Sequence, residues 1–300
     1  MAFDASTWMT PSGGDDITRA VNAGGYVSSA NVDVMEYVTI ASTGNVTDFG
    51  NLIAAVRGIA GCSNITRGCF GSGITSGYID VIQYITVAST GNASDFGNLT
   101  QARRDSGAVD NKVRGAWGTG YTGNGEGVNT IDYVTIASTG NASDFGDATV
   151  AYRDTFGCSG TARGVFCGGY DGSRSNVMMY ITLASTGNAT DFGNLTAPKF
   201  SVQATSDQEA RGVIGGGNDN SDINNIDLIN IASAGNATDF GDLTQARNGG
   251  GAAADHTRAL FTGGGNHDII DYVTIATTGN ASDFGNLSVG GAEYGSLSGG

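Results

Sequence analysis

Proline, histidine and basic residues are scarce in this sequence. Pro and His each occur twice in 300 residues, and charged residues make up only 14%, compared with roughly 25% in an ordinary soluble domain. The 14 Lys and Arg residues are outnumbered by 29 Asp and Glu residues, which gives a formal net charge of −15. Phosphate backbones and anionic membrane surfaces would repel such a chain, so we expect no nucleic-acid partner and no membrane insertion.

Long apolar runs and metal-binding motifs are also missing. No run approaches the roughly 20 residues of a membrane span, and the first residues, MAFDASTWMT, lack the basic region and apolar core of a secretory signal. We therefore expect synthesis in a cytoplasm. The cysteines form no CxxC pair and no cluster with histidine, so we expect no zinc site and no cofactor. We interpret them as small, half-buried thiols, and a disulfide between the first two remains open: Cys62, Cys69, Cys158 and Cys167.

Glycine is abundant, with 50 residues, and recurs between short apolar stretches, as expected of turns. The chain repeats itself. The segment Tyr-Val-Thr-Ile-Ala-Ser-Thr-Gly-Asn-Ala-Ser-Asp-Phe-Gly returns six times with small changes. Its Asp-Phe pairs are Asp48 and Phe49, Asp95 and Phe96, Asp144 and Phe145, Asp191 and Phe192, Asp239 and Phe240, and Asp283 and Phe284.

A second marker is an arginine followed by a short apolar run and glycine: Arg19, Arg67, Arg114, Arg163, Arg211 and Arg258. Both markers recur with a period of roughly 44–49 residues, which is typical of four-stranded propeller blades. Within one period, ARGVFCGG (162–169), NVMMYITLAS (176–185) and NATDFGNL (188–195) have strand-like patterns, and a fourth piece begins near a basic residue. No segment has a sustained helical period.

A single unit of this kind cannot bury both faces of its sheet, whereas six units arranged radially bury one another. The sequence therefore predicts an all-β, six-bladed propeller over residues 17–300, preceded by an N-terminal segment, 1–16. Ring closure needs a strand from a chain terminus. We favour the C-terminal run NLSVGGAEYGSLSGG, and the rival is the N-terminal stretch around Trp8.

The repeated residues are expected to be structural. Each Phe of Asp-Phe-Gly should pack between blades, because a sixfold motif without the other kinase motifs is not a metal-binding kinase segment. The six aspartates match the six arginines in number, so we expect ion pairs between them. The alternative is that each aspartate caps a backbone turn. Asn-x-Ser/Thr recurs, as at Asn92 and Asn236, and we interpret it as a turn rather than a glycosylation site.

A second basic set could bind an anion at one mouth of the central channel, although a structural role is the favoured interpretation: Arg57, Arg103, Arg153, Lys199 and Arg247. The two histidines, His256 and His267, lie in variable loops and are expected to be solvated. No carboxylate pair stands out from the repeat as a glycosidase would require, and no catalytic residues are assigned.

The connection after the glycine pair varies most between units, so binding is expected there. Tyrosines in these loops offer rigid, amphipathic contact area. The acidic loops 170–176 and 217–225 could hold Ca²⁺ through Asp171, Asp219 and Asp222, but their spacing does not match an EF-hand and solvated loops are favoured. The candidate binding residues are Tyr26, Tyr78, Tyr121, Tyr170, Asp171, Asp219, Asn266 and His267.

The order of apolar strand, Gly-Gly, loop, Tyr strand, aromatic strand and Leu-x-x-x-Arg resembles the Kelch repeat from about residue 17 onward. Kelch repeats usually carry Trp in the third strand, where this chain has Phe. The phrases TLASTGNATDFGNLT (182–196) and TARGVFCGG (161–169) also resemble repeat-rich structural proteins of marine, cyanobacterial tailed phages.

The phage resemblance implies a non-enzymatic virion protein, made in the host cytoplasm and located in the virion. Its partners would be other virion proteins and a host cell-surface glycan or protein, met through the variable loops. The alternative is a glycan-active enzyme on the same scaffold.

Overall fold

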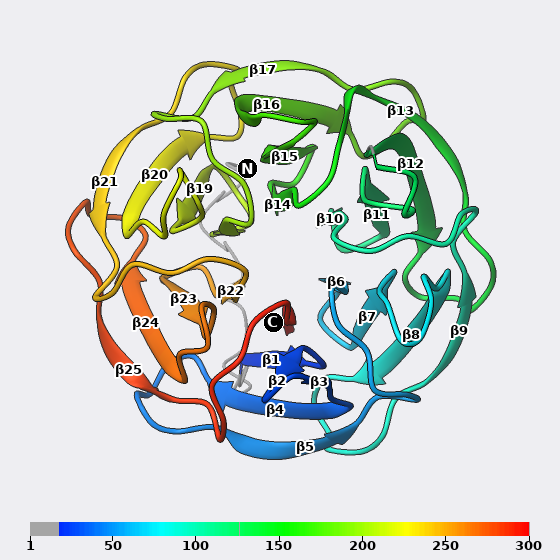
Figure 1. Ribbon diagram of the computed structural model, residues 1–300, viewed down its shortest axis with the longest axis horizontal. Coiled ribbons are helices and arrows are strands. Elements are labelled where there is room, and N and C mark those ends of the chain that lie inside the picture. Colours follow the sequence, from blue (N-terminus) through cyan, green and yellow to red (C-terminus); the bar gives the residue numbers. More distant parts are fainter. Residues whose placement is uncertain (1–17, 126, 300) are drawn as a thin grey trace, which may run out of the picture.

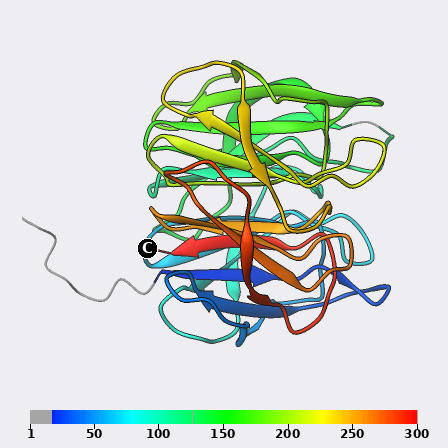
Figure 2. The same cartoon turned by 90° about the vertical axis from the view of Figure 1, so that its left-hand side faces the viewer.

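The computed structural model describes residues 18–125 and 127–299. These residues form six four-stranded antiparallel sheets arranged around a central axis (Figure 1). The side view in Figure 2 shows the sheets stacked around that axis as the blades of a propeller. The predicted all-β, six-bladed fold is therefore confirmed. The N-terminal segment 1–16, with Trp8, lies outside the described residues.

Each blade runs from an inner strand on the channel to an outer strand on the rim. Blade 1 contains β26 (Gly295–Gly299), β1 (Arg19–Ala23), β4 (Val34–Thr39) and β5 (Thr47–Asn51). Blade 2 contains β6 (Ala60–Ser63), β7 (Arg67–Gly71), β8 (Val81–Thr86) and β9 (Ser94–Asn98). Blade 3 contains β10 (Gly107–Asp110), β11 (Arg114–Gly118), β12 (Val128–Thr135) and β13 (Ser143–Tyr152).

The remaining blades repeat this order. Blade 4 contains β14 (Phe156–Ser159), β15 (Arg163–Tyr170), β16 (Arg174–Thr182) and β17 (Thr190–Asn194). Blade 5 contains β18 (Gln203–Ser206), β19 (Arg211–Gly215), β20 (Asn225–Asn230) and β21 (Thr238–Asp242). Blade 6 contains β22 (Gly251–Ala254), β23 (Arg258–Thr262), β24 (Ile269–Thr274) and β25 (Ser282–Asn286). A small hairpin of β2 (Tyr26–Val27) and β3 (Ala30–Asn31) lies in the connection between β1 and β4 of blade 1.

The C-terminal strand closes the ring. In Figure 1, red β26 lies beside blue β1, and the two strands pair antiparallel with Leu297 opposite Val21. Leu297 is only 4% exposed and packs with Ile85 and Val87 of blade 2. The predicted closure by the C-terminal run is therefore confirmed, and a strand from one end of the chain completes the sheet that begins at the other.

The core lies between blades. Phe49 of blade 1, for example, packs in one cluster with Phe70 and Ile85 of blade 2. All six repeat phenylalanines are 1–2% exposed: Phe49, Phe96, Phe145, Phe192, Phe240 and Phe284. Because each sheet buries its faces against its two neighbours, the ring is stabilised as a whole.

Five of the six arginines in the first set join neighbouring blades through backbone carbonyls. Arg67 lies over the ring of Tyr84 at 4.4 Å and donates from Nη1 to the carbonyl of Ile136 in blade 3. Tyr84 in turn packs edge-on against Phe96. The same stack, with the guanidinium over a tyrosine, occurs at Arg19, Arg114, Arg163 and Arg258. Blade 5 departs from this pattern, because Leu228 stands where the tyrosine would lie beneath Arg211.

The expected ion pairs between these arginines and the repeat aspartates are wrong. Within the described ranges, which include both sets, no salt bridge joins them. The six aspartates are exposed at the outer strands: Asp48, Asp95, Asp144, Asp191, Asp239 and Asp283. Five of the arginines, all except Arg211, instead point between blades, where carbonyl oxygens and a tyrosine ring satisfy the guanidinium.

The recurring Asn-x-Ser/Thr segments also join blades. The side chain of Asn92 accepts a hydrogen bond of 3.0 Å from the backbone N–H of Asn51 in the preceding blade. Equivalent bonds are accepted at each of the other five turns, by Asn141, Asn188, Asn236, Asn280 and Asn45. A side-chain amide at a rim turn thus takes the place of a backbone acceptor, which gives this repeated motif a structural role.

The four cysteines are buried and free, so the disulfide left open between Cys62 and Cys69 is not formed. They are more deeply buried than the half-buried thiols expected from the sequence. The described residues contain no helix that is long and apolar enough to cross a membrane.

Candidate functional site

The variable loops gather on one face of the propeller, which we call the loop face. It consists of the connections between the second and third strands of each blade and the linkers that lead into the next inner strand. Isolated bridges join the two kinds of segment, as between Arg104 and Tyr121 and between Arg153 and Tyr170. The loops are thus fixed to the linkers, which gives the variable residues a rigid support.

Three arginines of the linkers stack on the loop tyrosines. The guanidinium of Arg57 lies 4.2 Å from the ring centre of Tyr26. Arg153 lies between two rings, 5.0 Å from Tyr121 and 4.8 Å from Tyr170. Arg104 approaches the ring of Tyr121 at 5.6 Å.

Two aromatic pairs extend this arrangement. Tyr78 packs edge-on against Tyr121 at 5.7 Å, and Tyr170 packs against Phe200 at 5.4 Å. We call the whole set the Tyr–Arg band: Tyr26, Arg57, Tyr78, Arg104, Tyr121, Arg153, Tyr170 and Phe200. All eight side chains are half-buried, so each keeps part of its surface in solvent.

The other sequence candidates do not join this band. Asp171 is exposed, and its carboxylate accepts hydrogen bonds from Ser173 within the same turn. Asp219 is half-buried in the loop of blade 5, and Asn266 and His267 lie in the loop of blade 6. No group of three His, Cys, Asp or Glu residues suited to a metal occurs in the part of the chain that the structure describes.

A ring of backbone hydrogen bonds surrounds the axis at the loop face. Glu293 donates its N–H to the carbonyl of Gly249 at 2.5 Å, Gly249 donates to Ser201 at 2.8 Å, and Ser201 donates to Asp154 at 3.1 Å. The circle continues from Asp154 through Asp105 and Gly58 back to Glu293. All six residues have φ between 51° and 65°, a left-handed conformation that is uncommon outside glycine.

Three acids on this ring face the three arginines of the Tyr–Arg band. Arg104 Nη1 lies 3.0 Å from Asp105 Oδ2 and 3.3 Å from Glu293 Oε2, and Arg57 Nε lies 3.5 Å from Glu293 Oε2. Arg153 lies 3.8 Å from Asp154. The positive charge of the band is therefore largely balanced, which argues against a simple anion site.

The carboxyl groups of Asp105 and Asp154 interact with each other. Burial, followed by the negative charge of Asp154, raises the pKa of Asp105 well above its usual value. Burial also raises the pKa of Asp154, against the opposing charges of Arg153 and Arg104. This pair was missed from the sequence, where both residues look like ordinary loop acids after arginine.

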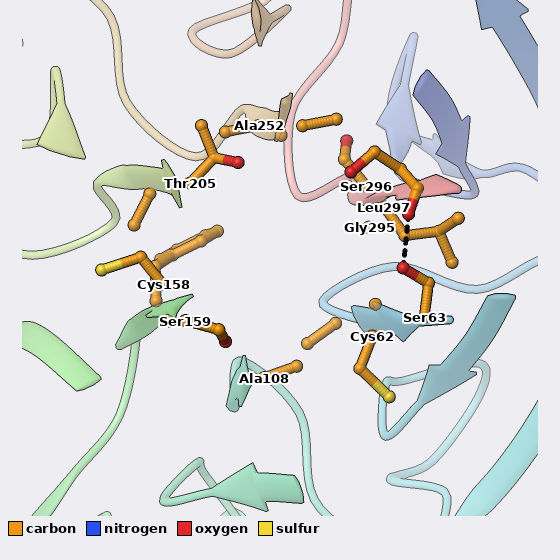
Figure 3. A pocket seen from close by; sticks show the side chains of 18 of the residues that line it. Cys62, Ser63, Ala108, Cys158, Ser159, Thr205, Ala252, Gly295, Ser296 and Leu297 are labelled. Carbon is orange, nitrogen blue, oxygen red and sulfur yellow. Dashed lines mark hydrogen bonds between the residues drawn. The ribbon is translucent and has the colours of Figure 1, made fainter. Parts of the chain in front are cut away.

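The cavity beside these acids is small. The cavity lined by Asp105, Asp154 and Glu293 has a volume of about 20 Å³. The central channel beyond the hydrogen-bonded ring has about 80 Å³ and is lined mostly by Gly, Ala, Ser and Cys residues of the inner strands. Figure 3 shows the small side chains around it, with Ser63 bonded to the carbonyl of Ser298. Both volumes are far below the roughly 300 Å³ of a small-molecule pocket.

The second basic set divides in two. Arg57 and Arg153 belong to the band, but Arg103, Lys199 and Arg247 are fully buried and form ion pairs of 2.8–3.1 Å with Asp132, Asp227 and Asp271. Burial lowers the pKa of all three cations, and the aspartates oppose that shift. These three residues therefore have the structural role that the sequence favoured, and they do not form an anion-binding ring at the channel mouth.

Of the two histidines, His256 is exposed, with its Nδ1 lying 2.9 Å from the carbonyl of Asp207, and His267 is half-buried. Arg104 and Phe200 are band residues that sequence reasoning missed. Alignment of the repeats could have found them, since both occupy the same linker position as Arg57 and Arg153.

No protein-family model matches the chain, and no curated protein matches its sequence.

Proposed function

We propose that this chain is a non-enzymatic binding protein of a virus particle, and that its partner binds at the loop face. The observation that carries the proposal is the Tyr–Arg band, in which half-buried aromatic and guanidinium groups are fixed in place at the most variable loops. Tyr and Arg are the residue types that dominate binding energy at interfaces. Because their rotamers are already restrained by stacking, little side-chain entropy is lost on binding.

A host cell-surface glycan suits this surface best. The C–H faces of sugar rings pack on exposed aromatic rings, and arginine and carboxylate groups beside them bond to hydroxyls. The charges of Arg104 and Arg153 are balanced by Asp105, Asp154 and Glu293, so the face does not demand an anionic ligand.

The finer family and source assignments belong to the same proposal. We propose that the blades are Kelch-like repeats in which Phe replaces Trp, and that the protein is a component of a tailed-phage virion with other virion proteins as neighbours. The Kelch-like assignment depends on the order of apolar strand, Gly-Gly, loop, Tyr strand, aromatic strand and Leu-x-x-x-Arg. The phage assignment depends on the resemblance of phrases such as TARGVFCGG (161–169) to phage structural proteins.

A glycan-active enzyme is the second candidate, and the Asp105–Asp154 pair favours it, because an acid with a raised pKa beside a second carboxylate is the equipment of a glycosidase. The cavity of about 20 Å³ at this pair argues against it. Release of reducing ends from bound glycans, lost in Asp105→Asn, would support the enzyme.

The experiment for the binding proposal is a glycan array probed with the purified protein. A variant with Tyr78→Ser and Tyr170→Ser should lose at least about tenfold in signal. The matched control carries Ile65→Ser and Val113→Ser, which are 68% and 62% exposed in hairpins on the opposite face. Equal loss in both variants, or loss only in the control, would reject the loop face as the binding surface.

A further inference from the structure

The buried ion pairs occupy a repeated position between blades. Between blades 2 and 3, Arg103 of the linker lies on Asp132 of β12. Between blades 4 and 5, Lys199 lies on Asp227, and between blades 5 and 6, Arg247 lies on Asp271. At each place a linker cation meets a carboxylate on the third strand of the following blade.

The junction between blades 6 and 1 keeps the acid and lacks the cation. Glu36 of β4 accepts a hydrogen bond of 3.4 Å from the N–H of Ser288, as Asp271 accepts one of 3.0 Å from Thr244. The residue at the cation position, four residues after the linker leucine, is Gly291. All 14 Lys and Arg residues of the chain lie within the described ranges, and none forms an ion pair with Glu36.

A second substitution leaves further room at this junction. In blade 3 the strand partner of Asp132 is Trp117, and in blade 6 the partner of Asp271 is Phe261, but in blade 1 the partner of Glu36 is Asn22. A large ring is thereby replaced by a short amide, which accepts hydrogen bonds from Thr262 and Ser296.

The resulting cavity, which we call the Glu36 socket, has a volume of about 70 Å³. Its lining includes Glu36, Tyr294 and four valines: Val27, Val32, Val34 and Val289. Val34 and Val289 are 40% and 50% exposed, so the apolar wall reaches the surface. Tyr294 takes part of the space of the missing side chain, since its hydroxyl lies 2.4 Å from where a Cβ on Gly291 would stand.

Charge and shape at this place are complementary to an amine on an alkyl stem. Glu36 and Asp268 both contribute to raising the pKa of Tyr294, after the larger effect of burial, so its ring sits as a neutral phenol in a negative environment. A cation beside a phenol ring and a carboxylate gains from both. The valines would cover the methylene groups, as protein surfaces do for the stem of lysine.

We propose that the Glu36 socket binds the ammonium or guanidinium end of an alkyl chain supplied by a ligand, in place of the cation that Arg103, Lys199 and Arg247 supply at the other junctions. The proposal does not depend on the proposed function, because the socket and the Tyr–Arg band share no residue. Failure of the glycan array would leave the socket unaffected.

The test is a titration of the labelled protein with n-butylammonium, followed by amide chemical shifts. Saturable shifts should appear at Val34, Val289 and Tyr294, with a Kd of about 1–10 mM as expected for so small a ligand. n-Butanol, which lacks the charge, should bind at least about tenfold more weakly. No saturable shift at these residues, or equal binding of butanol, would overturn the proposal.

Two variants and one further ligand sharpen the result. Glu36→Gln should weaken n-butylammonium binding at least about tenfold, while Glu209→Gln, which removes the same charge from an exposed loop of the opposite face, should leave it unchanged. Equal binding to Glu36→Gln and the unaltered protein would overturn the proposal. N-acetyl-lysine methylamide distinguishes the source: tighter binding than n-butylammonium assigns the socket to a partner's lysine, and weaker binding assigns it to a free amine.

Discussion

Arg103 Nη1 lies 2.8 Å from Asp132 Oδ2, and neither side chain is exposed to solvent. The same guanidinium donates to the carbonyl of Trp117 and to the hydroxyl of Ser106. The pair therefore joins a linker to two strands of the next blade. Removing one charge would leave the other buried without compensation, and that penalty is larger than the value of the pair itself.

We predict that Asp132→Ala lowers the free energy of unfolding by about 3–5 kcal/mol. The double variant Arg103→Met with Asp132→Leu should recover most of that loss, because no buried charge remains. Asp144→Ala on the neighbouring strand removes an exposed carboxylate and should change stability by less than about 0.5 kcal/mol. Urea unfolding measures all three, and a double variant as unstable as Asp132→Ala would contradict the explanation.

A single substitution in blade 5 should raise the free energy of unfolding. Leu228 leaves an open cavity of about 280 Å³ beside Arg211, where the other blades place a tyrosine ring. Leu228→Tyr should restore the stack on Arg211 and the edge contact with Phe240, and raise the free energy of unfolding by about 1 kcal/mol. Thermal unfolding measures the change, and Leu228→Met serves as a control without a ring. An unchanged or lower melting temperature in Leu228→Tyr would show that the stacks contribute nothing.

Ring closure depends on the last strand. Leu297→Ala should cost about 2–5 kcal/mol, because this side chain is buried between blades 1 and 2. Val289→Ala in the same terminal run is half exposed and should cost less than about 0.5 kcal/mol. Equal melting temperatures of these two variants would mean that β26 does not hold the ring closed.

Asp105 should make the free energy of unfolding depend on pH. Its pKa in the folded protein is raised well above its ordinary value of 3.8, mainly by burial and then by the negative charge of Asp154. A raised pKa means that the folded state binds the proton more tightly, so this contribution is complete below pH 3.8 and is lost as the pH rises through the folded-state pKa.

The variant Asp105→Asn has no carboxyl group at this position, so it does not lose stability through this group as the pH rises. The melting temperature of the variant relative to the original protein should therefore increase as the pH is raised from about 4 to 8. Asp171→Asn, at an exposed loop position, is the control and should follow the original protein at each pH. A constant difference between Asp105→Asn and the original protein would mean that the fold does not raise the pKa of Asp105.

The sequence predicted the blades because strand pattern, turn glycines and spacing repeat with one period. The buried ion pairs could not be predicted from the sequence, for a physical reason. Arg103 and Asp132 are 29 residues apart and lie on different elements. The cation position is Val56, Tyr152 or Gly291 at the other three junctions, so the pair does not recur in every repeat. The equal number of repeat arginines and repeat aspartates led to the wrong prediction of ion pairs between them. Two residues that recur with a similar period need not lie on the same side of a blade.

The loop tyrosines could be selected from the sequence, but their mutual contacts could not. Tyr78 and Tyr121 come from different blades, and they meet only because the ring brings neighbouring loops together. The left-handed ring at the axis was hidden as well, since its glycines, Gly58 and Gly249, align with Asp105 and Asp154, whose φ angles no local pattern predicts.

The most direct test of binding at the loop face is amide hydrogen exchange of the protein with and without the glycan that gives the strongest array signal. Binding there predicts slower exchange in the loops at 72–80, 119–125 and 169–174, with the hairpins at 63–67 and 110–114 unchanged. Protection confined to those hairpins of the opposite face would contradict it.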